Sequence, residues 1–241
     1  MNLVSVKHEL IWCREILADR QRPTVIELGA HHGTDTSELY DYCYGGPAKY
    51  IAVEADARNL PNLRLHMEKR TKNFFIVHAA IAAADGVVDL YQADGAEGTG
   101  SSSIRRPKKH LETWPQITFE RAVEVPAVTL DTLAEYFGID EIDLLWCDIQ
   151  GAERDMIAGG QRTLARTRWL LAEADQEEYY EGQALRDELP GLLPGFELIC
   201  EWPEHANLLF RRLPVYPVGI EKSEKPKPKR VPTMTPRNRP A

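Results

Sequence analysis

The sequence lacks an apolar run long enough to span a lipid bilayer. Its longest candidate, residues 142–147, is interrupted by Asp143 and is far shorter than the ~20 residues that a membrane helix needs. The N-terminal residues show no basic segment ahead of an apolar block and no small-residue cleavage site, which are the marks of a secretion signal. We therefore expect a soluble, cytoplasmic protein that has no membrane partner.

Cysteine is scarce and widely spaced. The chain has four cysteines and no C-x-x-C pair; they are Cys13, Cys43, Cys147 and Cys200. Zinc sites and redox motifs need closer spacing than this, and disulfides are rare in the cytoplasm. We expect separate, reduced thiols that are mostly buried.

Basic residues are in the minority, and they are unevenly placed. The chain has 29 Lys/Arg against 37 Asp/Glu, but residues 221–241 alone hold seven Lys/Arg and only two Glu. The acidic excess therefore lies in the first 220 residues. An acidic body repels phosphate backbones, so we do not expect nucleic acid as a partner.

The same C-terminal segment is poor in large apolar side chains. Residues 221–241 contain five prolines, and only Val231 and Met234 are larger apolar residues. So little apolar surface cannot offset the entropy of ordering the chain. We predict that residues 221–241 are a disordered tail and that residues 1–220 form one domain, which opens with an amphipathic helix within residues 1–20.

Strand-like and helix-like segments alternate through the rest of the chain. Expected strands cover residues 24–29, 50–53, 74–78, 86–91, 121–129, 143–147, 169–174, 196–200 and 207–212, and expected helices cover residues 34–42, 58–70, 130–137, 153–158 and 185–193. Such alternation predicts an α/β fold with a doubly wound, mostly parallel sheet. The last two strands are joined only by residues 201–206, which is too short for a parallel crossover, so they should form an antiparallel hairpin.

A glycine motif follows the first expected strand and opens a helix. It reads Glu27-Leu28-Gly29-Ala30-His31-His32-Gly33. The glycines allow a tight turn and a close approach of the backbone to a ligand, and the helix N-terminus offers free amides. The two adjacent histidines suggest a metal pair, but neighbouring side chains at a helix start diverge, so we interpret them as loop residues.

Two acidic residues stand at the ends of later strands. Glu54 closes the second strand, where a carboxylate can accept both hydroxyls of a ribose. Asp148 follows the buried strand 143–147, and in open α/β sheets the carboxyl ends of strands hold ligands and reacting groups. Asp148 can therefore orient a substrate, act as a base or bind a metal, and the alternative is a simple cap for the helix near Gly151.

The motifs together resemble the FkbM-type S-adenosylmethionine (SAM)-dependent methyltransferases. The resemblance covers residues 20–212 and takes in Ser101-Ser102-Ser103. Its four other segments are Val25-Ile26-Glu27-Leu28-Gly29-Ala30-His31-His32-Gly33-Thr34, Val128-Thr129-Leu130-Asp131-Thr132-Leu133, Asp143-Leu144-Leu145-Trp146-Cys147-Asp148-Ile149-Gln150-Gly151-Ala152-Glu153 and Tyr180-Glu181-Gly182-Gln183. Gln150 stands where that family more often has Glu, which weakens any carry-over of metal chemistry, and we assign no metal ligands.

The resemblance implies a Rossmann-like methyltransferase fold, SAM as the cofactor and a small-molecule hydroxyl as the methyl acceptor. Asp148 and His205 are then the candidate catalytic bases. The expected cofactor-binding residues are Glu27, Gly29, Ala30, His31, Gly33, Thr34, Glu54, Ala55 and Asp148. The acceptor stays open, and a sugar or a phosphorylated compound gripped by Arg105, Arg106, Lys108 and Lys109 is among the candidates.

Two other functions share parts of this pattern. A nicotinamide-dependent oxidoreductase would use the same fold and Glu54, but positions 31 and 34 lack the glycines of a G-x-G-x-x-G fingerprint. A non-catalytic adaptor would present its basic, proline-rich tail to a partner. The presence of Glu27, Gly29, Glu54 and Asp148 speaks against the adaptor, because an adaptor needs none of them.

Overall fold

The protein is represented by a computed structural model that describes residues 8–42, 49–68, 73–95 and 98–214. The predicted tail, residues 221–241, lies outside the described residues, as do residues 1–7 of the predicted N-terminal helix and Cys43. Predictions for these segments stay predictions.

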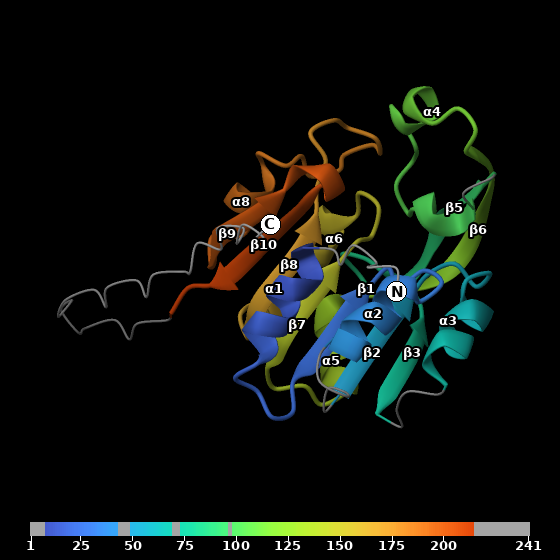
Figure 1. The fold of residues 1–241 in the computed structure, drawn as a ribbon. Helices are drawn as coiled ribbons and strands as arrows, with labels where there is room; N and C mark the ends of the chain where they lie inside the picture. The colour runs from blue at the N-terminus through green and yellow to red at the C-terminus, as the bar shows by residue number, and fades with distance from the viewer. Residues whose placement is uncertain (1–7, 43–48, 69–72, 96–97, 215–241) are drawn as a thin grey trace, which may run out of the picture.

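The described part of the chain is built around a seven-stranded sheet (Figure 1). Its strands are β1 (Thr24–Leu28), β2 (Lys49–Glu54), β3 (Phe74–His78), β7 (Ile142–Cys147), β8 (Thr167–Glu173), β9 (Phe196–Trp202) and β10 (Asn207–Arg212). The strand order is β3-β2-β1-β7-β8-β10-β9. Strands β3, β2, β1, β7 and β8 pair in parallel, whereas β10 runs antiparallel to both β8 and β9. The predicted fold class and the C-terminal hairpin are confirmed.

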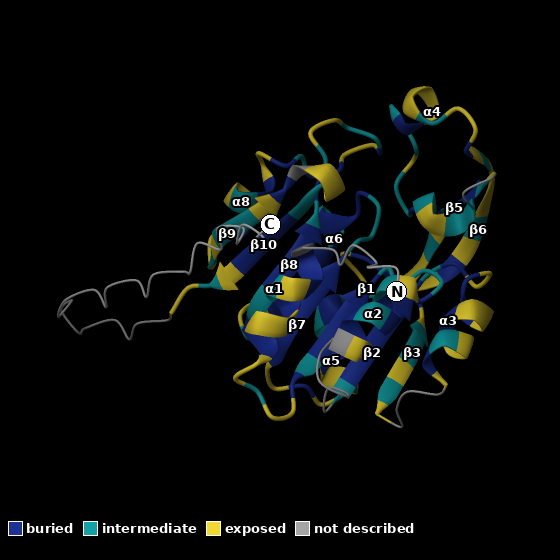
Figure 2. Ribbon diagram, viewed as in Figure 1, coloured by how far each residue is buried: buried dark blue, intermediate teal, exposed yellow. Residues whose placement is uncertain are grey.

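Helices cover both faces of this sheet because its central strands are apolar on both sides. One face packs against α1 (His8–Leu17), α2 (Thr34–Tyr42) and α3 (Leu60–Met67). The other packs against α5 (Leu130–Tyr136), α6 (Glu153–Ala158), α7 (Gln161–Leu164) and α8 (Leu189–Leu192). Neighbouring residues such as Leu144 and Leu145 point to opposite faces and are both fully buried, so the buried band follows the sheet through the molecule (Figure 2).

A second sheet of three strands stands beside the first. It consists of β4 (Ala80–Ile81), β5 (Gly86–Asp94) and β6 (Thr118–Val128) in the order β4-β6-β5. The chain between β5 and β6 carries the 3-10 helix η1 (Gly98–Ser101) and α4 (His110–Thr113), which project beyond the end of the main sheet (Figure 1). The sequence predicted β5 and β6 as strands, but not that they pair in a sheet of their own.

The last predicted helix is much shorter than expected. Instead of residues 185–193, α8 covers only Leu189–Leu192. The preceding residues form turns, and the backbone N–H of Arg186 donates a hydrogen bond to the carbonyl of Asp175. Apolar spacing alone predicted a helix at a place where the chain folds back toward β8.

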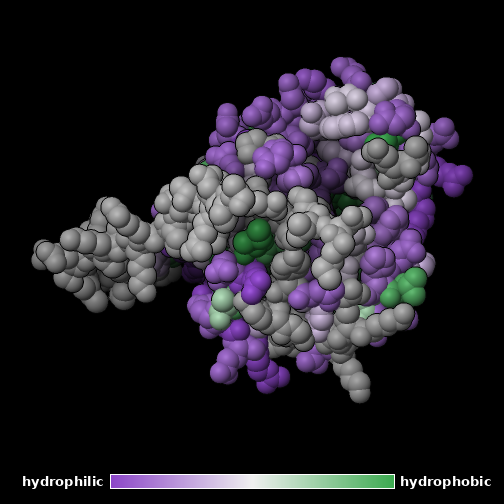
Figure 3. Space-filling view, viewed as in Figure 1, coloured by the Kyte–Doolittle hydropathy of each residue, from purple (hydrophilic) through white to green (hydrophobic). Residues whose placement is uncertain are grey.

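The surface and the thiols agree with the composition. The face in Figure 3 is mainly hydrophilic, with a few separate hydrophobic patches. No helix among the described residues is long and apolar enough to cross a membrane. Cys13 and Cys147 are buried, Cys200 is partly exposed, and all three are free thiols.

Candidate active site

The candidate site lies at the carboxyl edge of the main sheet. The strand order reverses direction at β1, which has β2 on one side and β7 on the other, and ligands of open α/β sheets bind at such a point. Two cavities, of about 180 Å³ and about 470 Å³, open there. They share four lining residues, Asp35, Trp146, Asp148 and Gln150. Asp148 therefore lies where the two cavities meet.

The first cavity collects most of the residues that the sequence singled out for the cofactor. Eight of them line it: Glu27, Gly29, Ala30, His31, Thr34, Glu54, Ala55 and Asp148. Gly33 is not among the lining residues. A Cβ atom on Gly33 would lie 2.8 Å from Leu63 Cδ1, so this glycine allows the start of α2 to pack against α3.

Gly29 has a structural task as well as its place in the cavity wall. Its φ angle is +84°, and a Cβ atom there would lie 1.7 Å from the carbonyl oxygen of Asp148. No side chain fits that gap. The glycine therefore lets the loop after β1 touch the loop after β7, which brings the two predicted motifs together.

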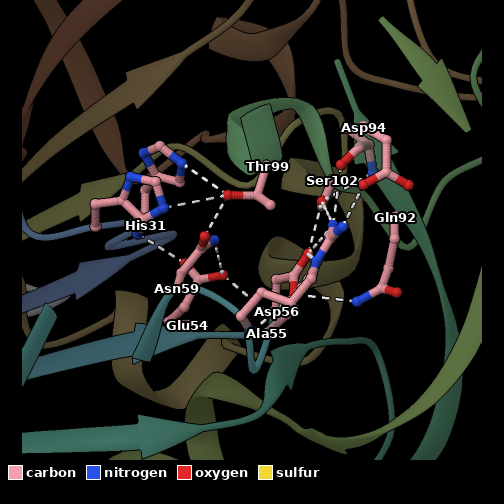
Figure 4. Close-up of polar contacts among 12 residues, drawn as sticks. His31, Glu54, Ala55, Asp56, Asn59, Gln92, Asp94, Thr99 and Ser102 are labelled. Atoms are coloured by element: carbon pink, nitrogen blue, oxygen red, sulfur yellow. Dashed lines mark hydrogen bonds and ion pairs between the residues drawn. The ribbon is translucent and has the colours of Figure 1, made fainter. Parts of the chain in front are cut away.

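Glu54 is buried and is held by three hydrogen bonds (Figure 4). One oxygen accepts from the backbone N–H of His31 at 2.7 Å, and the other accepts from the N–H of Asp56 at 2.8 Å and from the amide of Asn59 at 3.0 Å. Burial raises the pKa of Glu54, although these hydrogen bonds oppose the shift. A carboxylate has about four acceptor positions, so one is left for a ligand.

The two adjacent histidines do not diverge as predicted. The rings of His31 and His32 stack with centroids 3.9 Å apart, because His31 has a left-handed backbone with φ +48° that turns the chain. Their Nε2 atoms lie 3.1 Å and 3.4 Å from the hydroxyl of Thr99 in η1 (Figure 4). Burial, followed by the neighbouring ring, lowers the pKa of His31. The pair therefore holds η1 over the cavity.

A buried ion pair fixes the chain on the other side of η1. Asp56 is fully buried and accepts hydrogen bonds from Arg58, from Gln92 at 3.0 Å and from the hydroxyl of Ser102 at 3.0 Å. Arg58 also reaches Asp94 at 2.6 Å. Although burial alone would raise it, the pKa of Asp56 is lowered by hydrogen bonds from Arg58 and Ser102. Figure 4 shows this network beside the Thr99 contacts.

Glu27 brings a second buried carboxyl group to the first cavity. It accepts a hydrogen bond of 2.6 Å from the hydroxyl of Tyr50. Burial raises its pKa to about 8, against the effect of that hydrogen bond. A cationic group in the cavity would stabilise the ionised form of Glu27 and would be attracted to it in turn.

Gln150 joins the carboxylates at the meeting point of the cavities. Its amide nitrogen donates to Asp148 at 2.8 Å and to Glu173 at 3.0 Å, and its amide oxygen accepts from the Tyr180 hydroxyl at 3.0 Å. Burial, followed by the charge of Asp148, raises the pKa of Glu173 well above its ordinary value. Gln150 therefore holds the two carboxyl groups side by side, and burial favours the neutral form of Glu173.

Asp148 does not cap the following helix. The N-cap position of α6 is Ala152, and no side chain caps it. The carboxylate of Glu153 instead accepts from the backbone N–H of Gly151 at 3.3 Å, and burial raises the pKa of Glu153 to about 8. Glu153 thus fixes the turn that presents Asp148 and Gln150.

The second cavity includes one further predicted residue, His205. It belongs to η2 (Pro203–His205) and is an exposed residue of the cavity wall. The basic stretch lies outside the lining of both cavities. Three of its four charges are paired elsewhere, since Arg105 contacts Asp155, Lys108 contacts Glu178 and Lys109 contacts Glu177, and Arg106 lies over the ring of Tyr91. The prediction that this stretch grips a phosphorylated acceptor therefore has no support in the geometry.

Several site residues carried no assigned role in the sequence. Tyr180 and Ser103 stood inside motifs of the family resemblance, and they contact the side-chain and backbone oxygens of Gln150. Asn59 and Thr99 had no motif at all. Among the described residues, no group of three or more His, Cys, Asp or Glu side chains is placed to hold a metal ion.

The main sheet is mostly parallel, has one antiparallel strand next to its edge and carries a cavity at its first strand. This is the arrangement of a Rossmann-like methyltransferase. A family model described as the methyltransferase FkbM domain matches residues 27–209. This chain belongs to the FkbM family of SAM-dependent methyltransferases.

Individual proteins show the same likeness. The 2-O-methyltransferase NoeI of Sinorhizobium fredii (strain NBRC 101917 / NGR234) is 32% identical over 191 residues, which are 78% of this chain and 77% of that protein. The crystal structure of methyltransferase FkbM from Methylobacillus flagellatus matches with a TM-score of 0.52 at 14% identity, over 79% of this chain and 43% of that one. The present chain therefore spans less than half of the crystallised protein, and that likeness concerns the fold alone.

Proposed function

We propose that this protein is a SAM-dependent O-methyltransferase that acts on a small-molecule hydroxyl. The observation that carries the proposal is the position of Asp148. This carboxylate is shared by both cavities and is held by Gln150. A base in that place touches a cofactor on one side and an acceptor on the other.

The first cavity suits SAM in shape and charge. Its wall beside Glu54 is apolar and includes Ala80, Ile81 and Leu90, which fits an adenine ring. The free acceptor position of Glu54 fits a ribose hydroxyl. Glu27 and Asp148 lie at the end nearer β1 and β7, where a bound sulfonium group would stabilise the ionised form of Glu27.

When bound, SAM supplies an electrophilic methyl group. Asp148 orients the acceptor hydroxyl and takes its proton as the oxygen attacks. The amide of Gln150 fixes the direction of both carboxyl groups, and burial favours the neutral form of Glu173. The rest of the site holds the reacting groups in line and excludes water. His205, exposed in the wall of the second cavity, is the alternative base.

The relative NoeI is named a 2-O-methyltransferase, which supports oxygen over other acceptor atoms. The oxidoreductase alternative is weakened because His31 and Thr34 stand at two positions where the G-x-G-x-x-G fingerprint has glycine. The adaptor alternative does not explain why a hydrogen-bonded carboxylate pair lies between two cavities.

Calorimetry and a transfer assay test the proposal together. We expect S-adenosylhomocysteine to bind and NAD not to bind. Labelled methyl groups from SAM should then appear on hydroxyl acceptors in a screen of small molecules. Binding of NAD alone, or transfer to nitrogen acceptors only, would contradict the proposal.

A further inference from the structure

Two buried polar atoms in the second cavity have no hydrogen-bond partner within the described residues. They are Oε2 of Glu9 and Nδ1 of His110. Both residues line the cavity and are only 1% and 3% exposed. A buried carboxylate oxygen without a partner is energetically unfavourable, because it has lost its hydrogen bonds to water. Such atoms in a cavity wall are places where a bound molecule supplies the missing hydrogen bond.

Glu9 is held firmly at its place. It lies in the first turn of α1, and its other oxygen accepts a hydrogen bond of 3.0 Å from the amide of Asn207. Asn207 stands directly opposite Glu173 in the β8–β10 pairing. Glu9 is therefore linked through Asn207 to the strand that carries Glu173. Glu173 shares the amide of Gln150 with Asp148, and Glu9 and Asp148 lie at different ends of the second cavity.

The charge of this cavity excludes one class of acceptor. Among the described residues, its lining contains six carboxyl groups and no lysine or arginine; the carboxyl groups are those of Glu9, Asp35, Asp148, Glu173, Asp175 and Glu204. A phosphate or carboxylate in such a place meets like charges without a counterion. Hydroxyl and ammonium groups, by contrast, are donors that these oxygens can accept from.

Aromatic rings form the wall that carries His110. The centroid of His110 lies 4.8 Å from that of Trp114 and 5.4 Å from that of Tyr180, and Trp114 lies 4.7 Å from Tyr179. All four residues line the cavity. Ring faces of this kind pack against the apolar side of a saturated ring or against a cation.

We propose that the second cavity binds an uncharged or cationic acceptor with several hydrogen-bond donors, and that Glu9 binds a hydroxyl or ammonium group other than the one that is methylated. His110 supplies a further polar contact from the aromatic wall. The inference rests on the proposed function for the methylated hydroxyl, and it adds that phosphorylated acceptors are rejected. Glu9 is thus a specificity-determining residue on a helix that no motif includes.

The test compares three sets of probes on the full-length protein with S-adenosylhomocysteine bound. They are neutral methyl glycosides, amino sugars and sugar phosphates of matched size. Binding is measured by NMR saturation transfer, and methyl transfer is measured separately with labelled SAM. We expect the neutral or amino probes to bind and the phosphates not to bind, and the better of the first two sets identifies the group at Glu9.

Two variants locate the contact. Glu9→Gln should raise KM for the preferred probe at least tenfold and leave kcat within about twofold, because Glu9 is remote from the transferred methyl group. His110→Phe keeps a ring in the wall but removes the nitrogen, and it should also raise KM for this probe. Glu15→Gln on the exposed side of α1 is the matched control and should change neither constant. Melting temperature and S-adenosylhomocysteine affinity show whether each variant is folded.

The outcomes separate the two proposals. Preferred binding of phosphates, or an unchanged KM in both the Glu9 and the His110 variants, would overturn this inference even if hydroxyls are methylated. Probe binding that depends on Glu9, without transfer to any hydroxyl, would support this inference and overturn the proposed function.

Discussion

Gln150 shows how single residues set the chemistry of this site. It has a left-handed backbone with φ +51°, which is uncommon for a residue with a side chain. That conformation places its amide between Asp148 and Glu173. Strained residues of this kind persist where the surroundings hold them in place, as at active sites. An amide at this position satisfies two carboxyl groups without adding a third negative charge.

Asp148→Asn separates a catalytic role from a positioning role. The substitution keeps the shape and removes the charge, so we expect turnover to fall about 10²-fold or more, the range for a lost general base. S-adenosylhomocysteine affinity and melting temperature should stay close to those of the wild type. Rates are compared with and without a chelator once an acceptor is known. Activity near the wild-type level would exclude Asp148 as the base.

Glu54→Gln tests the cofactor end of the site. The amide keeps the size of the side chain but loses the charge and one acceptor, and a hydrogen bond to a charged group contributes about 1.5–3 kcal/mol. We expect the dissociation constant of S-adenosylhomocysteine to rise at least tenfold in calorimetry. Glu38→Gln in the neighbouring α2, a half-buried residue outside the lining of the first cavity, serves as control. Equal affinities for all three proteins would place the ribose elsewhere.

At the scale of elements, local pattern predicted the strands of the main sheet and most of its helices, but it missed α7, overextended α8 and did not show how distant segments pair. Strand β7 was evident because its apolar run is bounded by Asp148 and a turn. The second sheet was missed because β4 has only two residues and because β5 and β6 are separated by the long segment that carries η1 and α4. Pairing over such a separation depends on tertiary packing, which periodicity does not report.

Arg58 is expected to hold η1 and its flanks in place. In Arg58→Leu the buried Asp56 loses its charged partner and keeps its contacts to Gln92, to Ser102 and to the backbone N–H of residue 58. Because Arg58 is about one third exposed, we expect a loss of about 1–3 kcal/mol in unfolding free energy. Amide exchange in residues 98–102 should speed up.

Arg64→Leu removes an exposed arginine from α3, the helix that follows Arg58, and is the control for that experiment. It should leave exchange in residues 98–102 unchanged. Similar exchange in both variants would mean that the Asp56–Arg58 pair does not restrain this segment.

At the scale of the whole molecule, the two cavities of the site differ in how many of their residues could be predicted from the sequence. The first cavity depends on short motifs at the ends of β1, β2 and β7, so its residues stood out in the sequence. The second cavity combines Glu9, His110 and Asn207, which are far apart in the chain and belong to no motif. Only the packing of α1 on the sheet, and the course of the chain through α4, brings them to one cavity.

The fold also buries carboxyl groups whose titration should be visible in global stability. The pKa values of Glu27 and Glu153 are raised by burial to about 8 from an ordinary value of 4.5. Between pH 4.5 and 8 the folded protein therefore holds protons that the unfolded chain has released. Unfolding then releases protons, so the free energy of unfolding falls as pH rises through this window.

Glu153→Gln isolates one of these protons. The amide is neutral at every pH and can still accept from the N–H of Gly151, so the variant should lose stability less steeply than the wild type between pH 5 and 8. For a single proton the two slopes should differ by about 1.4 kcal/mol per pH unit, with the variant relatively more stable toward pH 8. Urea unfolding at several pH values measures both slopes, and Glu27→Gln, which removes the other such carboxyl group, should flatten the curve in the same way. Parallel curves for the wild type and Glu153→Gln would show that Glu153 is already ionised in the folded protein, and the turn that presents Asp148 would then be held by a charged group.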